Sequence, residues 1–402
     1  MTNFLPNLAF EDELLHPERS FARGTQAAIA DLAPLMALVA NPIDRVVVAA
    51  DSVPEGVPPC LQHVKFVHVN SPSADSKGSP LVPWGWTDRA IALAKKTGQS
   101  RHPPLTAVHA ANSRRFLSTF DKVVWKNGQY ENADETFGRE CDSIQQFNDI
   151  VTHWLNAGNK RLVVKPQISH AGRNRIFVDT LALNDQQQGW LKKRIDDGVY
   201  VEPWVVRQQE WSVQYDIPSP DCEPAAPQFV GVTQLLNDSE GRYAGNILLG
   251  AETVPNLTWI KQQAEEICTN AQAAGYWGPL GIDSFQFHDS SGNEGLRLCN
   301  DINARFTMGR LALHLGGFVR DDKFGAWCQF PQRCIGSDRA KYVDPEKNAA
   351  KILAGLGLEN VSVVRTSPQF VGGKPVRTTT LLLTGPSIAE LTQAQQVLHG
   401  TL

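Results

Sequence analysis

Three oxygen-bearing side chains, Asp283, Asp301 and Asn303, lie in two apolar runs that a polar turn separates. The runs, 278–287 and 296–305, have the length and composition of two strands joined as a hairpin. Alternate residues of a strand share a face, so the three side chains can project to one side. Oxygen ligands without a thiolate or imidazole suit a hard cation such as Mg²⁺ that bridges to phosphates. The alternative is an exposed polar edge, but the apolar flanks favour a buried hairpin.

A second group of residues could hold a nucleotide. Lys165 ends an apolar run that starts at Leu162, and the loop after it contains Ser169 and Gly172. A lysine ammonium and the backbone N–H groups of a short Ser/Gly loop can surround phosphate oxygens. The spacing differs from that of a P-loop. A solvated hairpin is the alternative, because Lys-Pro before a turn is weak evidence by itself.

Two strand-like runs farther along the chain each carry one acid. Glu202 lies in the run 199–206, and Glu210 begins the run 210–215. A carboxylate can accept a hydrogen bond from an adenine amine or a ribose hydroxyl, and backbone groups of an open strand can pair with a base edge. The alternative for either acid is a solvated strand end.

The elements that must position these residues begin with an α/β unit. Hydrophobic periodicity predicts a helix over 28–39, and β-branched runs predict strands over 45–50 and 64–69. A Gly/Pro/Ser-rich loop over 71–85 and a second helix over 87–96 follow. Trp84 and Trp86 are expected to be packing residues rather than parts of a pocket, because most indoles are.

The next segment leads toward the residues described above. The apolar run 105–111 is interpreted as a strand, and it is followed by Arg114 and Arg115, which could meet a phosphate. The polar segment 126–142 indicates a boundary, because it is acidic and lacks periodicity. A helix over 143–156 follows, then alternating short strands and helices as far as about Phe318, and finally two strands and a helix over 361–398.

Composition limits the classes of function. The chain has 402 residues, 42% of them apolar, and a formal net charge of -4, which is typical of an enzyme-sized protein with a large core. Because its net charge is negative, the chain has no overall positive potential that would bind a nucleic-acid backbone. Neither a signal peptide nor an apolar run of membrane-spanning length is present in the sequence, so a cytoplasmic protein is expected. The seven cysteines are scattered without a C-x-x-C pair and do not indicate zinc or a disulfide framework.

Taken in order, these motifs resemble those of the ATP-grasp superfamily. The matching segments are Lys165-Pro166 with its Ser/Gly loop, 201–205, 210–213, 281–283 and 301–305, within a region of about 105–318. The resemblance implies a fold class of α/β and α+β, in which an ATP-grasp fold follows an α/β (pre-ATP-grasp) domain. The implied domains are 1–125, an ATP-grasp domain of two lobes at 126–330 with the nucleotide between them, and an α+β extension at 331–402.

The resemblance also implies roles for individual residues. Lys165 would contact the phosphates and the adenine side, Glu202 and the Val205 backbone would read the adenine edge, and Glu210 would hold the ribose. Mg²⁺ would be carried by Asp283, Asp301 and Asn303, and Arg305 would neutralise charge on the transferred phosphoryl group. The loop that contains Ser169 and Gly172 would close over the phosphates. Lys165 and Arg305 are the expected catalytic residues.

Two positions depart from the family pattern. Asp301 stands where a glutamate is common, and its shorter reach puts bidentate bridging of two metal ions in doubt. No clear lysine stands at the usual basic position near the start of the central lobe; Arg114 and Arg115 are candidates for it, and an arginine fork binds phosphate differently from a lysine.

The expected activity is that of an ATP- and Mg²⁺-dependent ligase that activates a carboxylate as an acyl phosphate for attack by an amine or another nucleophile. The alternatives are an ATP-grasp kinase that phosphorylates a hydroxyl and a non-catalytic ATP-binding module. The expected partners are a small-molecule carboxylate and a nucleophile co-substrate, without nucleic acid or membrane, and a homodimer stays open. Substrate identity would depend on loops such as 71–86 and the tail after Arg320.

Overall fold

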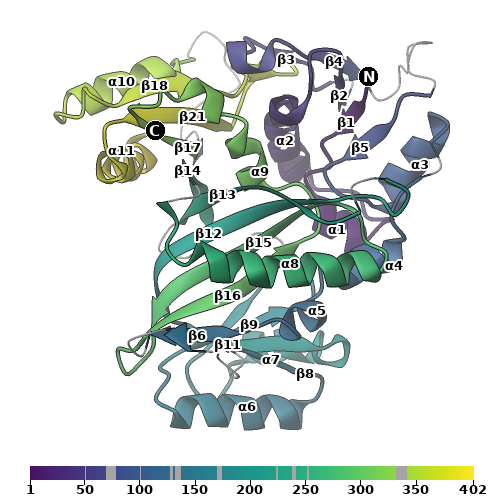
Figure 1. Ribbon diagram of the computed structural model, residues 1–402, viewed down its shortest axis with the longest axis vertical. Helices are drawn as coiled ribbons and strands as arrows, with labels where there is room; N and C mark the ends of the chain where they lie inside the picture. The colour runs from purple at the N-terminus through teal and green to yellow at the C-terminus, as the bar shows by residue number, and fades with distance from the viewer. Residues whose placement is uncertain are drawn as a thin grey trace.

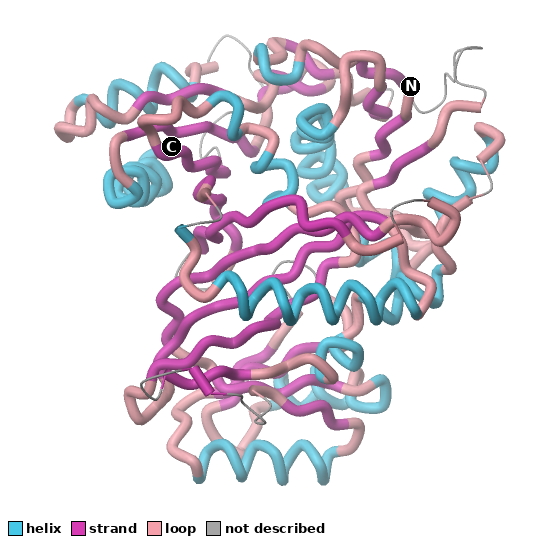
Figure 2. Tube along the Cα trace, viewed as in Figure 1, coloured by secondary structure: helices cyan, strands magenta, loops and turns pink. Residues whose placement is uncertain are grey.

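The computed structural model describes residues 1–49, 51–68, 78–99, 101–126, 130–131, 137–169, 174–222, 225–237, 241–250, 253–331 and 342–402. Its described strands form four sheets, which Figure 2 shows in magenta. One sheet is parallel and the others are antiparallel, so the chain combines α/β and α+β architecture as expected. No helix in the described part of the chain is both long and apolar enough to cross a membrane.

The N-terminal unit is a parallel sheet with strand order β4-β2-β1-β5. Its elements are β1 (Asn3–Leu5), α1 (Phe10–Leu15), α2 (Arg23–Leu32), η1 (Ala33–Val39), β2 (Arg45–Val48), η2 (Pro59–Leu61), β4 (Lys65–His68), β5 (Leu81–Pro83) and α3 (Asp88–Lys96). The expectation of a loop through 71–85 is wrong at β5, which pairs with β1 through a contact that no local pattern reveals. Trp84 and Trp86 are buried, as packing residues should be.

The segment after this unit is helical rather than extended. α4 (Leu105–Ala111) replaces the expected strand, and α5 (Arg114–Ser118) follows it. Pro104 stands at the N-cap of α4, and Ala107, Val108 and Ala111 are buried at helical spacing. A short apolar run does not distinguish a strand from a buried helix, which explains the error.

A small lobe is built on an antiparallel sheet with strand order β10-β9-β11-β8. Its elements are β8 (Arg139–Cys141), α6 (Ile144–Asn156), β9 (Leu162–Pro166), β10 (Ile176–Val178), α7 (Asp185–Lys192), η4 (Ile195–Asp197) and β11 (Val199–Pro203). Every residue of β9 and β11 is buried, so a charged side chain on either strand needs a partner inside the protein.

The large sheet has ten strands in the order β18-β21-β17-β14-β13-β12-β15-β16-β6-β7. These are β6 (Val123–Lys126), β7 (Tyr130–Glu131), β12 (Val206–Ile217), β13 (Gln228–Asn237), β14 (Tyr243–Leu248), β15 (Gly278–His288), β16 (Glu294–Asn303), β17 (Phe324–Pro331), β18 (Ser362–Arg365) and β21 (Thr378–Gly385). β15 and β16 form the predicted hairpin. Figure 1 shows α8 (Leu257–Ala273) along this sheet and the small lobe next to β6 and β16.

The remaining elements complete the C-terminal part and its contact with the N-terminal unit. They are α9 (Met308–Leu313), η6 (Gly316–Phe318), α10 (Pro345–Ala354), α11 (Ile388–Thr401) and a three-stranded sheet of β3 (Pro54–Glu55), β19 (Phe370–Val371) and β20 (Lys374–Pro375). The segment 361–398 therefore holds more strands than the two expected. The domain ranges 1–125, 126–330 and 331–402 stay predictions, and β6 and β17 at their borders both belong to the large sheet.

Candidate active site

The predicted metal residues lie together on the β15–β16 hairpin. Asp283 and Asp301 are directly paired across the ladder, and Asn303 is opposite Gly281. Asp283 Oδ1 accepts a hydrogen bond from Ser212 Oγ at 2.5 Å, and Asp283 Oδ2 accepts one from Asn303 Nδ2 at 3.3 Å. The hairpin thus brings two carboxylates and one amide to one place, which the alternation of the two strands predicts.

The electrostatics of this group favour a cation. Burial raises the pKa of Asp283 to about 7; the Ser212 hydrogen bond opposes this shift, and the charges of Asp301 and Glu210 add to it. A positive charge beside Asp283 would therefore stabilise the ionised carboxylate. Oxygen donors of this kind fit Mg²⁺. Among the residues that the structure describes, no group of three or more His, Cys, Asp or Glu side chains could hold a metal, so the amide oxygen of Asn303 would have to complete the set.

Arg305 lies beside the metal residues and is held from the N-terminal unit. Its Nε and Nη2 are both 2.7 Å from Glu11 Oε1, and its Nη2 donates to Asn303 Oδ1 at 2.9 Å. Glu11 is a buried residue of α1, and nothing in the sequence pattern indicated it. The contact joins the N-terminal unit to the end of β16 and orients the predicted catalytic guanidinium next to Asn303.

Lys165 and Glu202, on the adjacent strands β9 and β11, form a buried ion pair. Lys165 Nζ lies 2.5 Å from Glu202 Oε1, and Glu202 Oε2 accepts from Arg297 Nη1 at 2.9 Å. Burial lowers the pKa of Lys165 to about 8, although the charge of Glu202 opposes this. Burial alone would raise the pKa of Glu202, but the charges of Arg297 and Lys165 hold it at about 2. Both oxygens of Glu202 therefore bind protein cations in this arrangement, and its role at an adenine edge stays a prediction.

Arg297 and Asp121 complete this charged cluster and were missed in the sequence. Arg297 on β16 is fully buried, and it binds Asp121 through Nε–Oδ1 and Nη2–Oδ2 contacts of 2.8 and 2.9 Å. Tyr200 also donates to Asp121. An arginine inside an apolar run signals a buried partner. This pattern would have identified Arg297 from the sequence, whereas the residues around Asp121 show no pattern that indicates a buried acid.

The other predicted nucleotide residues surround this cluster. Glu210 accepts from Arg207 Nη1 at 2.6 Å and from Asn237 Nδ2 at 2.9 Å, and Val205 is half-buried between β11 and β12. Ser169 is half-buried just after β9, while Gly172 lies outside the described residues. The roles of these residues in binding ATP stay predictions.

Arg114 connects the end of β9 with the metal residues. Its side chain is buried, Nη1 donates to the backbone oxygen of Pro166 at 2.6 Å, and Nη2 lies 3.7 Å from Asp301 Oδ1. Arg115, the other candidate, instead binds Glu140 at the surface, with its Nε 2.8 Å from Glu140 Oε1. Of the two arginines, Arg114 lies beside the predicted metal residues and Arg115 does not, and a role of Arg114 at the phosphates stays a prediction.

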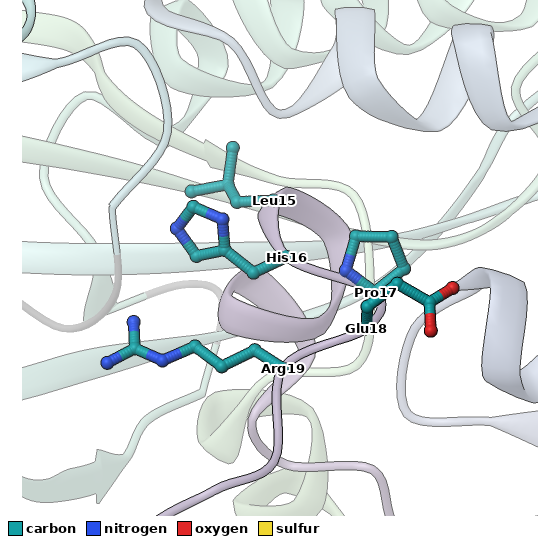
Figure 3. A pocket seen from close by; sticks show the side chains of 5 residues that line it. All are labelled: Leu15, His16, Pro17, Glu18 and Arg19. Atoms are coloured by element: carbon teal, nitrogen blue, oxygen red, sulfur yellow. The ribbon is translucent and has the colours of Figure 1, made fainter.

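A shallow surface depression elsewhere does not compete with this site. It is lined by Leu15, His16, Pro17, Glu18 and Arg19, a single segment that begins at the last residue of α1 (Figure 3). The side chains of His16 and Arg19 extend to one side in Figure 3, and that of Glu18 extends to the other. One local segment of this kind does not gather groups from several elements, as a binding site usually does.

The comparisons with known proteins concern the fold. Neither family models nor curated protein sequences match the chain. Carboxyaminoimidazole ribonucleotide synthase from Aspergillus clavatus, complexed with ATP, superposes with a TM-score of 0.53 at 12% identity over 100% of this chain and 99% of that chain. Biotin carboxylase from Campylobacter jejuni gives 0.52 at 9% identity over 99% and 94%. N5-carboxyaminoimidazole synthetase from Staphylococcus aureus gives 0.52 at 11% identity over 99% and 97%. The chain therefore has the ATP-grasp fold, preceded by an α/β unit, as its motifs predict.

Proposed function

We propose that the chain is an ATP- and Mg²⁺-dependent ligase that activates a carboxylate as an acyl phosphate for attack by an amine or another nucleophile. The observation that carries this proposal is the grouping of Asp283, Asp301, Asn303 and Arg305 at the end of the β15–β16 hairpin. A metal-binding set beside a guanidinium fits phosphoryl transfer, because both must offset charge on the transferred group.

The proposed role of each residue follows from its position in the site. Asp283, Asp301 and Asn303 would hold Mg²⁺, which neutralises phosphate charge when it is bound. Arg114 and Lys165, on the side of β9, would face the nucleotide phosphates. Arg305 would neutralise the transferred phosphoryl group beside Asn303. Glu210 would reach the ribose, and the Val205 backbone would pair with the base.

The chemistry proceeds in two displacements. A carboxylate oxygen attacks the γ-phosphorus, and the bond between that phosphorus and the oxygen of ADP breaks. The nucleophile then attacks the carbonyl carbon, and the C–O bond to phosphate breaks, so the released phosphate keeps one oxygen of the carboxylate. Holding both reactants in one geometry accounts for much of the acceleration that such a site can provide.

Proteins of similar fold support the choice of substrates. One is the biotin carboxylase domain dimer of Hydrogenobacter thermophilus 2-oxoglutarate carboxylase, in complex with MgADP and bicarbonate, with a TM-score of 0.50 at 9% identity. We therefore include bicarbonate among the candidate acids for this chain and extend the proposal to a homodimer. Light scattering of the purified protein tests the second point, and a monomer at micromolar concentration would contradict it.

The experiment that tests the activity follows ADP release with pools of small carboxylates, with and without amines. Hydroxylamine should then trap the acyl phosphate as a hydroxamate, and ¹⁸O from the labelled carboxylate should appear in the released phosphate. A stable phosphorylated alcohol, formed without hydroxamate or label transfer, would identify a kinase instead. ADP release without an added acid, in buffer freed of dissolved bicarbonate, would also contradict the ligase.

A further inference from the structure

A chain of buried polar groups leads from the metal residues to the start of α9. Ser212 on β12 is paired with Asp283, and its Oγ donates to Asp283 Oδ1 at 2.5 Å. Gln214 Nε2 donates to Ser212 Oγ at 2.8 Å, and Thr307 Oγ1 donates to Gln214 Oε1 at 2.8 Å. Ser212, Gln214 and Thr307 are all buried, so their hydrogen bonds do not exchange freely with water.

The chain has one direction, because each group receives one hydrogen bond and passes one on. Thr307 caps α9 by accepting the Arg310 N–H at 3.0 Å, which leaves its own proton for Gln214. The Gln214 carbonyl oxygen accepts the hydrogen bond from the Thr307 hydroxyl, so the Gln214 NH₂ group faces Ser212 and donates to its Oγ. Because Ser212 Oγ already accepts the hydrogen bond from Gln214, its own O–H group donates to Asp283.

A second path closes this chain into a ring. Asn303 Nδ2 donates to Asp283 Oδ2, and Asn303 lies four residues before Thr307, in the segment that also carries Arg305. Gly281 precedes Asp283 by two residues and so lies on the same face of β15. Its lack of a side chain leaves room for the ring, because a Cβ there would lie 2.7 Å from Thr307 Cγ2 and 3.1 Å from Gln214 Oε1. Both oxygens of Asp283 are thus tied to the 303–307 segment.

We propose that Ser212, Gln214 and Thr307 are positioning residues that orient the Asp283 carboxylate toward the metal and fix it relative to the segment that carries Arg305. The inference rests on the proposed function, because it takes Asp283 as a metal ligand. Groups that orient metal ligands in this way typically change metal affinity about 10- to 100-fold when they are removed. Thr307 does not bind Asp283 directly, so an effect of Thr307 on the metal has to pass through the ring.

The test measures Mn²⁺ affinity by electron paramagnetic resonance in the presence of ADP, together with ADP affinity in excess chelator. Ser212→Ala should weaken Mn²⁺ binding by at least about 10-fold. Thr307→Val, which removes the hydroxyl in the same shape, should also weaken it, whereas Thr307→Ser should restore it. ADP affinity in chelator should stay the same in all variants. The matched control is Ser284→Ala, which changes the residue after Asp283 on β15; the buried Oγ of Ser284 has no hydrogen-bond partner among the described residues.

The outcomes separate this inference from the proposed function. Wild-type protein that binds ADP but no Mn²⁺ would overturn both. Wild-type binding of Mn²⁺, with Ser212→Ala and Thr307→Val equal to Ser284→Ala, would overturn the ring alone. Equal losses in Thr307→Val and Thr307→Ser would point to packing at α9 and would also overturn it. If Ser212→Ala does not fold, the comparison of the two Thr307 variants decides.

Discussion

Replacing Arg297 with methionine should destabilise the protein far more than the same change at a surface arginine. Arg297 is fully buried, makes two contacts with Asp121 and donates to Glu202 at 2.9 Å. Arg297→Met leaves both acids buried without this cation. Removing one partner of a buried ionic group costs about 3 to 5 kcal/mol of unfolding free energy. The methionine fills part of the volume, so most of that cost is electrostatic.

Arg320 provides the matched control. It binds Asp322 through the same pair of atoms, Nε–Oδ1 and Nη2–Oδ2, at 3.0 Å each, but both side chains are mostly exposed. Arg320→Met should therefore cost less than about 1 kcal/mol. Urea unfolding, followed by tryptophan fluorescence, measures both values. Equal destabilisation by the two substitutions would refute the reasoning, and Arg297→Met combined with Asp121→Asn should recover part of the loss.

Three further predictions concern the metal and the nucleotide. The variants Asp283→Asn and Asn303→Ala should fold normally and lose ADP formation, and wild-type turnover in either variant would remove that residue from the site. The variant Asp301→Glu should stay active if Asp301 only replaces the commoner glutamate. Mg-ATP should raise the melting temperature more than ATP with excess chelator, and equal shifts would contradict the metal assignment. Because burial raises the pKa of Asp283 from 3.8 to about 7, its contribution to stability is complete below about pH 4 and is lost as the pH rises through 7. Asp283→Asn should flatten that part of the pH–stability profile measured by urea unfolding in chelator, and an unchanged profile would contradict the shift.

The parts of the site that the sequence predicts are those that one stretch of chain carries. Asp283, Asp301 and Asn303 share a hairpin, and strand alternation plus a polar turn is enough to place them together. Apolar runs also place Lys165 and Glu202 on buried strands, and β9 and β11 confirm this. The order of these motifs, rather than any one of them, indicated the fold.

The parts that the sequence does not predict depend on contacts between distant residues. Arg297 and Asp121 are 176 positions apart, and Arg305 and Glu11 are 294 apart. No periodicity relates such positions, and a single sequence does not show which acid a buried arginine meets. The strand prediction for 105–111 was wrong for a different reason, since most of its seven residues are apolar or small and fit a strand as well as a helix until the burial of one face is known.

The charges around the site explain why nucleotide and metal should bind together. Lys165, Arg297 and Arg305 each contact a buried acid, so these cations are already neutralised before a phosphate arrives. Asp283 and Asp301 add negative charge next to them, with Arg114 no closer than 3.7 Å to Asp301. An ATP molecule without metal would bring its phosphate charge toward Asp283 and Asp301, whose negative charge Arg305 and Arg114 offset only in part, and this costs free energy at short range in a partly buried site. A divalent cation at Asp283 changes the sign of that interaction. The affinity for ATP should therefore depend on the metal more steeply than the number of contacts to the phosphates would suggest.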